Sequence, residues 1–199
     1  MTDRPGLRER KKARTRALIQ KEALRLFREQ GYAATTVEQV AAAAEVATST
    51  VFRYFATKEE LVMVDQFPPF MEALRGVPPE AGPVAAVRLA MRAVLEGQTA
   101  EERIDGLERE RLMLTVPELW AATLGNVTGV LKKLRDALAE REGRPADDPE
   151  LRDVTGAIVG VIMGVWLEWV NDPSIDATTE LDRALSHLEA GLPLPRPAG

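Results

Sequence analysis

The sequence predicts an all-α protein of about nine helices, with an N-terminal three-helix domain and a C-terminal helical bundle. In successive segments between residues 15 and 190, apolar residues recur at every third or fourth position, which is the spacing of one helix face. Thr36 and Thr57 are each followed, three positions later, by Gln or Glu, the spacing typical of a helix start. Stretches rich in proline and glycine, such as residues 76–83, separate the helical segments.

Residues 1–64 are predicted to form the first domain, which centres on two short helices joined by a tight turn. A helix over residues 15–30 comes first, and Gly31 is placed to end it. The first short helix follows, with one apolar face. The second spans Thr48–Tyr54, and its apolar residues also share one face. That face is expected to pack, while the small polar side chains of the second helix stay exposed.

The second short helix has the features of a helix that enters the major groove of DNA. Its first turn carries the hydroxyl groups of Thr48, Ser49 and Thr50, which allow close approach and exchange hydrogen bonds with base edges. Lys58 and the backbone amides that follow Thr36 are placed to reach phosphates. The alternative is a plain helical hairpin with solvated hydroxyls, since short helix pairs are common in all-helical domains.

The charge of the chain is unevenly distributed, although its net charge is -5. Residues 1–64 contain 12 Lys and Arg against 8 Asp and Glu, whereas residues 65–199 contain 14 against 23, so the two parts carry +4 and -9. The basic part is the one predicted to bind DNA, which fits binding driven by phosphate neutralisation. Segment 8–16 holds six of these bases, either as a flexible arm that reaches DNA or as a solvated terminus.

A series of residues in the N-terminal domain matches the pattern of a known family. The matching positions are Ala23, Leu26, Phe27, Gly31, Tyr32, Thr35 to Val37, Val40 to Ala44, Val46, Thr50, Tyr54, Phe55, Lys58, Glu59 and Leu61. In these residues the sequence resembles the DNA-binding domain of TetR-family transcriptional regulators. The resemblance implies that Thr48–Tyr54 is the recognition helix and that Thr36, Tyr54 and Lys58 contact phosphates. Arg53 of the same helix completes the set of DNA-binding candidates.

Two positions depart from the family pattern. Glu45 stands in the turn where the family usually has Gly, so it must adopt a left-handed conformation that Gly adopts at about 1 kcal/mol less. Phe52 stands where the family usually has Tyr, so a phosphate hydrogen bond commonly made there is absent. Neither change is expected to break the fold.

Residues 65–191 are predicted to form a second, wholly helical domain, followed by a disordered tail over residues 192–199. The later helical stripes begin near residues 84, 101, 117, 150 and 178. Asp148, followed by a proline, is the expected cap of the helix that begins near residue 150.

A pair of prolines marks the predicted boundary between the two domains. The helix that follows the two short ones is expected to run from Thr57 to about Phe67, where the adjacent Pro68 and Pro69 stop or kink it. The proline pair is either a joint between the domains or an ordinary helix end.

Three glycines recur at every fourth position in the most apolar predicted helix, Glu150–Asn171. Gly156, Gly160 and Gly164 clear one stripe of side chains, so that another backbone can come close. Because each glycine costs about 0.8–1 kcal/mol in a helix interior, three of them predict a tight helix contact. That contact lies within the subunit or at a two-fold dimer interface, and the family resemblance favours a homodimer formed through the last two helices. The other dimer candidates are Leu181, Leu185 and Leu188.

Large apolar side chains of the C-terminal part are candidates for a ligand pocket or for ordinary core positions. TetR-like proteins typically hold a small-molecule inducer in this domain, and the pocket prediction follows mainly from that resemblance. An apolar or aromatic inducer is expected. The candidates are Phe67, Phe70, Met71, Met91, Met113, Trp120, Met163 and Trp166.

The sequence offers little support for catalysis, cofactor binding or a metal site. No cysteine is present, and the single histidine, His187, stands alone. The glycine patterns of nucleotide binding and the nucleophile motif of hydrolases are absent. The N-terminus lacks the apolar stretch of a secretory signal, and the longest apolar run, 156–167, is shorter than the roughly 18 residues of a membrane span. We therefore expect a cytoplasmic protein that enters no membrane, is no enzyme and needs no cofactor.

Together these observations predict a ligand-responsive, TetR-like repressor that binds a palindromic DNA operator as a homodimer and is released by a small-molecule inducer. The alternative is a helical dimer that binds or hydrolyses a small molecule and keeps the helix-turn-helix only as a scaffold. Phe52 and Glu45 are the residues that leave room for this alternative. Salt-dependent binding of DNA separates the two hypotheses.

Overall fold

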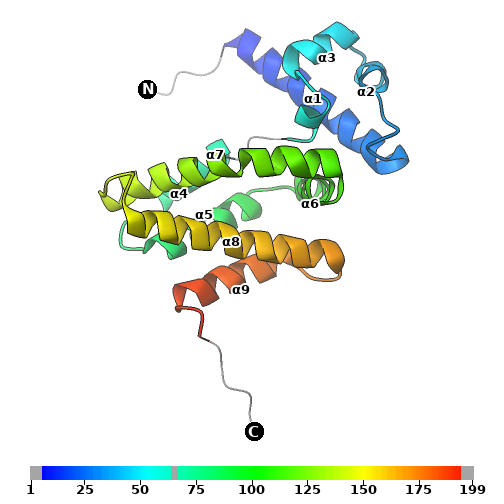
Figure 1. Cartoon of the computed structure of the whole chain (residues 1–199). Helices are drawn as coiled ribbons and strands as arrows, with labels where there is room; N and C mark the ends of the chain where they lie inside the picture. The colour runs from blue at the N-terminus through cyan, green and yellow to red at the C-terminus, as the bar shows by residue number, and fades with distance from the viewer. Residues whose placement is uncertain (1–5, 64–66, 194–199) are drawn as a thin grey trace. The chain divides into compact units, whose positions relative to one another are not determined.

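The computed structural model describes residues 6–63 and 67–193, and every regular element in these ranges is a helix (Figure 1). Nine α-helices and one short 3-10 helix occur there. The all-α fold expected from the sequence is confirmed. The last residues of the predicted disordered tail, from 194 onward, lie outside the described residues.

The chain divides into two compact units, which are described separately here. The first unit combines residues 1–64 with residues 104–120, and the second combines residues 65–103 with residues 121–199. Residues 104–120 therefore pack with the N-terminal helices, although chain order alone places them in the C-terminal domain. The first unit contains α1 (Leu7–Gln30), α2 (Val37–Ala43), α3 (Thr48–Tyr54), the 3-10 helix η1 (Glu59–Leu61), most of α6 (Ala100–Thr115) and the start of α7 (Pro117–Glu142).

The first unit is built around one apolar core. From α1 this core receives Ile19, Ala23, Leu24 and Phe27, all of which are buried. Val40 of α2, Val51 of α3 and the flanking Phe55 lie in the same core, as do Leu112 of α6 and Leu119 of α7. An ion pair between Arg28 and Asp105, with a 3.0 Å separation of Nη2 and Oδ1, also joins α1 to α6. Helices α2 and α3 thus share one core with α1 and α6.

Helix α1 begins earlier than its apolar stripe indicates. It runs without interruption from Leu7 to Gln30, so the basic segment 8–16, expected as a flexible arm or a solvated terminus, is helical. The Ala, Arg and Lys residues of this segment favour helix, and they extend the turn that the apolar residues begin. The predicted stop is present, because Gly31 adopts a positive φ of 86° after the last turn.

The helix expected to begin at Thr57 is much shorter than predicted. The backbone amide of Ala56, rather than that of Thr57, donates to the Glu60 carboxylate at 2.7 Å, and only the 3-10 turn η1 forms. Residues 64–66 lie outside the described residues, and α4 (Phe67–Gly76) begins directly after them. Pro68 and Pro69 therefore lie in the first turn of a helix rather than at the end of one. A proline is tolerated there, since a first-turn N–H has no partner within its helix.

The second unit is a helical bundle. Helix α4 packs on α5 (Pro83–Glu96), and α9 (Ala177–Glu189) packs on both α5 and α8 (Pro149–Asn171). Asp148 caps α8 as predicted, with its carboxylate accepting from the amides of Glu150 and Leu151 at 2.8 and 3.3 Å. Two apolar cores fill the bundle, one around Ile158, Leu138 and Leu185 and one around Leu74, Ala86 and Ala90.

Helix α8 is, within the described ranges, the one helix long and apolar enough to cross a membrane, by length and composition only. Its most apolar window has a mean hydropathy of 1.5, and 22% of that window is buried. Core helices of soluble proteins pass the same criterion, and the buried residues of α8, among them Ile158 and Trp169, occupy positions on one side of the bundle helix. Its exposed side is poor in charge beyond the first turn.

Candidate nucleic-acid interface

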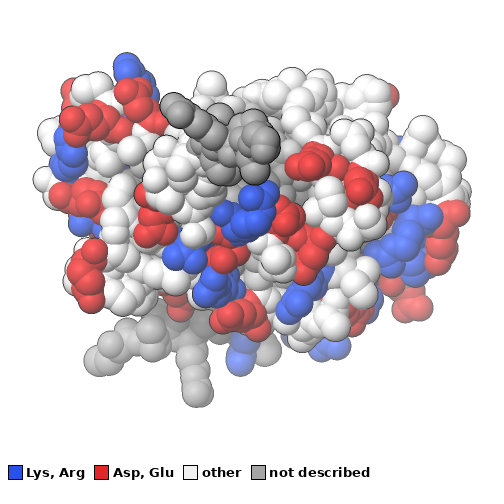
Figure 2. Space-filling model, turned by 90° about the horizontal axis from the view of Figure 1, so that it is seen from below, with Lys and Arg blue, Asp and Glu red and all other residues white. Residues whose placement is uncertain are grey.

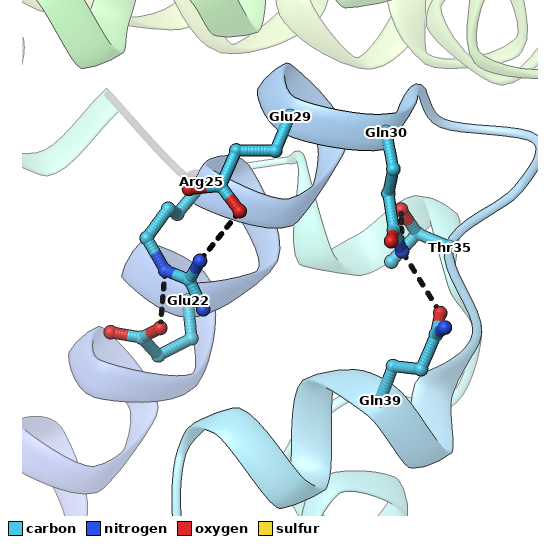
Figure 3. A network of polar contacts seen from close by, with 6 residues as sticks. All are labelled: Glu22, Arg25, Glu29, Gln30, Thr35 and Gln39. Carbon is cyan, nitrogen blue, oxygen red and sulfur yellow. Dashed lines mark hydrogen bonds and ion pairs between the residues drawn. The ribbon is translucent and has the colours of Figure 1, made fainter.

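The entry to α2 is fixed by the capping arrangement that the sequence predicts. The Thr36 hydroxyl accepts from the Gln39 amide at 3.2 Å, and the Gln39 side chain accepts from the Thr36 amide at 2.8 Å. Gln30 at the end of α1 donates to the same Gln39 oxygen at 3.0 Å and to the Thr35 hydroxyl at 3.1 Å (Figure 3). The first turn of α2 is therefore hydrogen-bonded to the end of α1, and these bonds fix the position of one helix relative to the other.

The turn between α2 and α3 contains the strained residue that the sequence indicates. Glu45 has a φ of 54°, in the left-handed region that favours glycine. The Val46 amide then donates to the Ala41 carbonyl at 2.9 Å, which closes the turn and directs the chain into α3. Helix α3 spans Thr48–Tyr54, the range predicted for the recognition helix.

Helix α3 buries one side and exposes the other. Val51 is 1% exposed and anchors the helix in the core. Ser49 and Arg53 are exposed, Phe52 is 51% exposed, and Thr48, Thr50 and Tyr54 are half-buried. The exposed side thus offers a hydroxyl, an aromatic ring and a guanidinium, which are groups that contact base edges, thymine methyl groups and phosphates.

Arg16 of α1 fastens the C-terminal end of α3. Its Nη1 donates to the Tyr54 carbonyl at 3.1 Å, and its guanidinium carbon lies 4.5 Å from the centre of the Phe55 ring. A cation is favourable at this end because the last carbonyls of a helix carry partial negative charge. In the sequence Arg16 is only one of the six bases of segment 8–16, since no local pattern links position 16 to position 54.

Lys58 is more enclosed than a surface phosphate contact. Its ammonium donates to the Tyr32 carbonyl at 2.5 Å and lies 4.2 Å from the centre of the Tyr32 ring. Burial lowers the pKa of the Lys58 ammonium, partly opposed by the nearby carboxylate of Glu59. An ammonium has three donors, so the bond to the Tyr32 carbonyl does not use all of them.

The predicted pocket residues are divided between the two units. Phe67, Phe70, Met71 and Met91 pack against the two cores of the second unit, and the rings of Phe67 and Phe70 lie 5.8 Å apart. Met113 instead packs against the core of the first unit, and Trp120 also belongs to that unit. Met163 and Trp166 are half-buried on α8, where Trp166 meets Trp169 edge-on at 5.6 Å.

An open cleft of about 280 Å³ lies in the second unit between α5 and α9, beside the start of α6. Met91 is the one predicted pocket residue that lines it. Arg92 and Arg88 both approach Asp182 there, at 2.6 and 3.4 Å. Burial disfavours the Asp182 carboxylate, but the two arginines hold its pKa below the usual range. Figure 2 shows basic and acidic side chains intermixed on the face of the molecule that is seen from below.

The glycines of α8 and the leucines of α9 differ in their surroundings. Gly156, Gly160 and Gly164 are exposed, and an added Cβ at each would meet no atom within 4 Å. Leu181 and Leu185, in contrast, are 3% and 1% exposed and pack inside their own chain, because α9 lies on α5. Both side chains are therefore covered within their own chain, and their contact with a second subunit stays a prediction. The remaining candidate, Leu188, is half-buried.

No group of three or more His, Asp or Glu side chains arranged to hold a metal ion occurs among the described residues. His187 lies near the end of α9, with its Nε2 2.8 Å from the Pro193 carbonyl. The histidine thus has a backbone partner rather than a carboxylate partner.

The fold and the exposed α3 define a class of protein: an all-helical protein that carries a helix-turn-helix head for DNA. Comparison with known families gives the same answer. Residues 19–63 match the family described as bacterial regulatory proteins, tetR family, and residues 81–193 match the MftR C-terminal domain family. A curated relative, the HTH-type transcriptional regulator TcmR of Streptomyces glaucescens, is 36% identical over 97% of this chain and 88% of its own. The chain belongs to the TetR family of transcriptional regulators, and this expectation from the sequence is confirmed.

Solved structures of regulators have a similar fold. FadR of Thermus thermophilus, a TetR-family repressor in complex with lauroyl-CoA, is 26% identical with a TM-score of 0.57, over 92% of this chain and 98% of that chain. SmeT, the repressor of a Stenotrophomonas maltophilia multidrug efflux pump, gives a TM-score of 0.60 at 22% identity, over 92% and 97% of the two chains. A SmeT–triclosan complex gives a TM-score of 0.63 at the same identity. The two SmeT structures support the fold alone.

Proposed function

We propose that this protein is a homodimeric repressor that binds a palindromic operator through α3 and is released by a small-molecule inducer. The observation that carries the proposal is α3 itself, which is anchored by Val51 and exposes Ser49, Phe52 and Arg53 on one side. Thr48 and Thr50 complete the base-reading set, and Thr36, Tyr54 and Lys58 are proposed to contact phosphates. An exposed reading face on a packed head fits a major groove.

A two-fold dimer explains how a ligand would control such a protein. Half-sites on one face of B-DNA are separated by multiples of about 34 Å, so two heads bind together only at a matching distance. An inducer that prefers another arrangement of the heads lowers operator affinity by its differential affinity for the two states. The open glycine stripe of α8 supports a close contact between two copies.

An apolar or aromatic inducer is the part of the proposal supported by similar proteins. Lauroyl-CoA, the molecule bound to FadR, has a large apolar portion. The apolar and aromatic side chains of the second unit, among them Phe67, Phe70 and Met91, suit such a molecule. We place the protein in the cytoplasm, where the operator is, and assign it no enzymatic activity and no cofactor.

Selection of bound duplexes from a random-sequence pool tests the proposal. The wild-type protein is expected to enrich one palindromic motif, and affinity for that motif is expected to fall with salt. Ser49→Ala and Arg53→Ala are expected to weaken binding of the motif by about 10-fold or more each, because a direct base or phosphate contact contributes about 1–3 kcal/mol. Arg75→Ala, which removes an exposed charge from the second unit, serves as the matched control.

Enrichment of no motif, or equal affinity for every duplex, would contradict the proposal. Enrichment of a single half-site without a symmetric mate would contradict the homodimer while leaving DNA recognition intact. Compounds with an apolar body are then screened for release of the selected duplex, and release must be absent for the polar portion of the same compound alone.

A further inference from the structure

The N-terminal half of α1 carries a row of basic side chains in line with its packed face. Ile19 and Ala23 are fully buried in the core of the first unit. Arg16, Lys12 and Arg8 precede Ile19 at steps of three and four residues, which places them on the same side of the helix. All three are exposed. One side of α1 is therefore apolar where the helix packs in the core of the first unit, and basic where the helix extends beyond that core.

Arg16 marks the position on this side of α1 where α3 ends. Its hydrogen bond to the Tyr54 carbonyl and its stacking on Phe55 place it at the last turn of α3. In Figure 1 the first turns of α1 continue past that end of α3. Lys12 and Arg8 are one and two turns further along, and the continuous helix fixes their direction relative to α3.

We propose that Arg8 and Lys12 bind the phosphate backbone of the DNA that flanks the half-site read by α3. This inference rests on the proposed function and names a further part of the same interface. The eight residue steps from Arg16 to Arg8 span about 12 Å of helix, which corresponds to three or four steps of about 3.4 Å along a DNA strand. The side of α1 that is buried at Ile19 and contacts the last turn of α3 at Arg16 is exposed at Lys12 and Arg8.

The charge pattern of the extension supports a polyanionic partner. Segment 8–16 holds six bases and one acid, Glu9. Arg8 and Lys12 are four residues apart, as are Lys12 and Arg16, and like charges at this spacing destabilise a helix by a few tenths of a kcal/mol per pair. Phosphates opposite this row relieve that repulsion and release their condensed counterions. Binding to DNA thus removes the charge repulsion that destabilises this part of α1 in the free protein.

The slope of log affinity against log salt concentration tests the proposal, with the duplex selected above as the probe. Replacing Arg8 and Lys12 together by Gln is expected to reduce the magnitude of the slope by about 3.6 for a dimer on two half-sites, because each of the four lost phosphate contacts removes about 0.9. The double change Arg10→Gln and Arg14→Gln is the matched control. It removes the same charge at the same spacing from exposed positions on the opposite side of α1, and it is expected to change the slope by less than half as much.

A duplex trimmed to the ends of the half-sites provides the second arm. On this duplex the Arg8 and Lys12 double variant is expected to bind as tightly as the wild type. Equal slopes for the two double variants, or an unchanged deficit on the trimmed duplex, would overturn the inference. If the wild type instead binds selected and scrambled duplexes alike, the proposed function itself fails. Helix content and melting temperature are measured for all proteins, and Gln keeps the helix propensity of Arg and Lys.

Discussion

At the scale of single residues, Glu110 of α6 is a partly buried carboxyl with no hydrogen bond or ion pair to any other described residue. Burial raises the pKa of Glu110 to about 7. A carboxyl whose pKa is raised on folding stabilises the unfolded state at any pH where it is ionised in the unfolded chain. The destabilisation of the folded protein by Glu110 is therefore absent at pH values below about 4.5. It grows between pH 4.5 and 7 and is complete above pH 7.

The variant Glu110→Gln is expected to stabilise the protein at pH 8 and to leave its stability unchanged at pH 4.5. The gain at pH 8 is at most about 3 kcal/mol, since one pKa unit corresponds to about 1.4 kcal/mol. Thermal unfolding at the two pH values measures it. Glu80→Gln, at an exposed loop position, is the control and is expected to show no such difference. A gain of equal size at both pH values would assign the effect to packing rather than to charge.

At the scale of elements, the turn between α2 and α3 combines a left-handed φ with a residue that disfavours it. Replacing Glu45 by Gly is expected to raise the free energy of unfolding by about 0.5–1 kcal/mol, because the strain removed exceeds the added freedom of the unfolded chain. Chemical denaturation measures the change. Glu45→Ala keeps the strain and removes the side chain, so it is expected to leave stability nearly unchanged. If the Ala variant were as stable as the Gly variant, the side chain rather than the backbone would be the source of the cost.

The starts and ends of several helices could be predicted from the sequence because they depend on local contacts. The Thr36 cap, Gly31 as a stop and the span of α3 depend on neighbours within a few residues, so local patterns predicted them. The spacing of Thr57 and Glu60 fits the same local pattern. In the structure, however, the Glu60 carboxylate accepts from the Ala56 amide, and only a 3-10 turn follows. Local spacing sets which bonds are feasible, and tertiary packing selects among them.

Long-range features of the candidate site escaped the sequence for the same reason. Arg16 meets Tyr54 across 38 positions, and Arg28 meets Asp105 across 77. Leu181 and Leu185 form a helical stripe that is equally suited to an intrachain and an interchain contact, and the packing of α9 on α5 supplies the intrachain one. An apolar stripe predicts that a surface is covered but not which surface covers it.

At the scale of the whole molecule, the chain passes between the two units at three places. It does so after residue 64, within α6 after residue 103 and within α7 after residue 120. Two of the three passages are continuous helix, which transmits displacement better than a flexible linker does. A ligand that shifts α6 or α7 in the second unit therefore acts on residues that belong to the core of the first, among them Leu112 and Leu119.

The open glycine stripe of α8 leads to a prediction about assembly. Gly160→Leu is expected to convert a dimer into a monomer, because a large side chain prevents the close approach of a second backbone. Nothing lies within 4 Å of a Cβ built at this position, and leucine favours helix over glycine by about 0.8 kcal/mol, so the subunit fold is expected to stay intact. Sedimentation measures the mass, and affinity for a two-half-site duplex is expected to fall with it.

Gly129→Leu makes the same substitution at an exposed, open position of α7 and is expected to leave both mass and affinity unchanged. If the Gly160 variant stays dimeric and binds the duplex like the wild type, the subunits meet through another surface. If the wild type itself sediments as a monomer at micromolar concentration, a single head must bind alone. The requirement for two half-sites at a fixed separation would then fall, and with it the route by which an inducer releases the DNA.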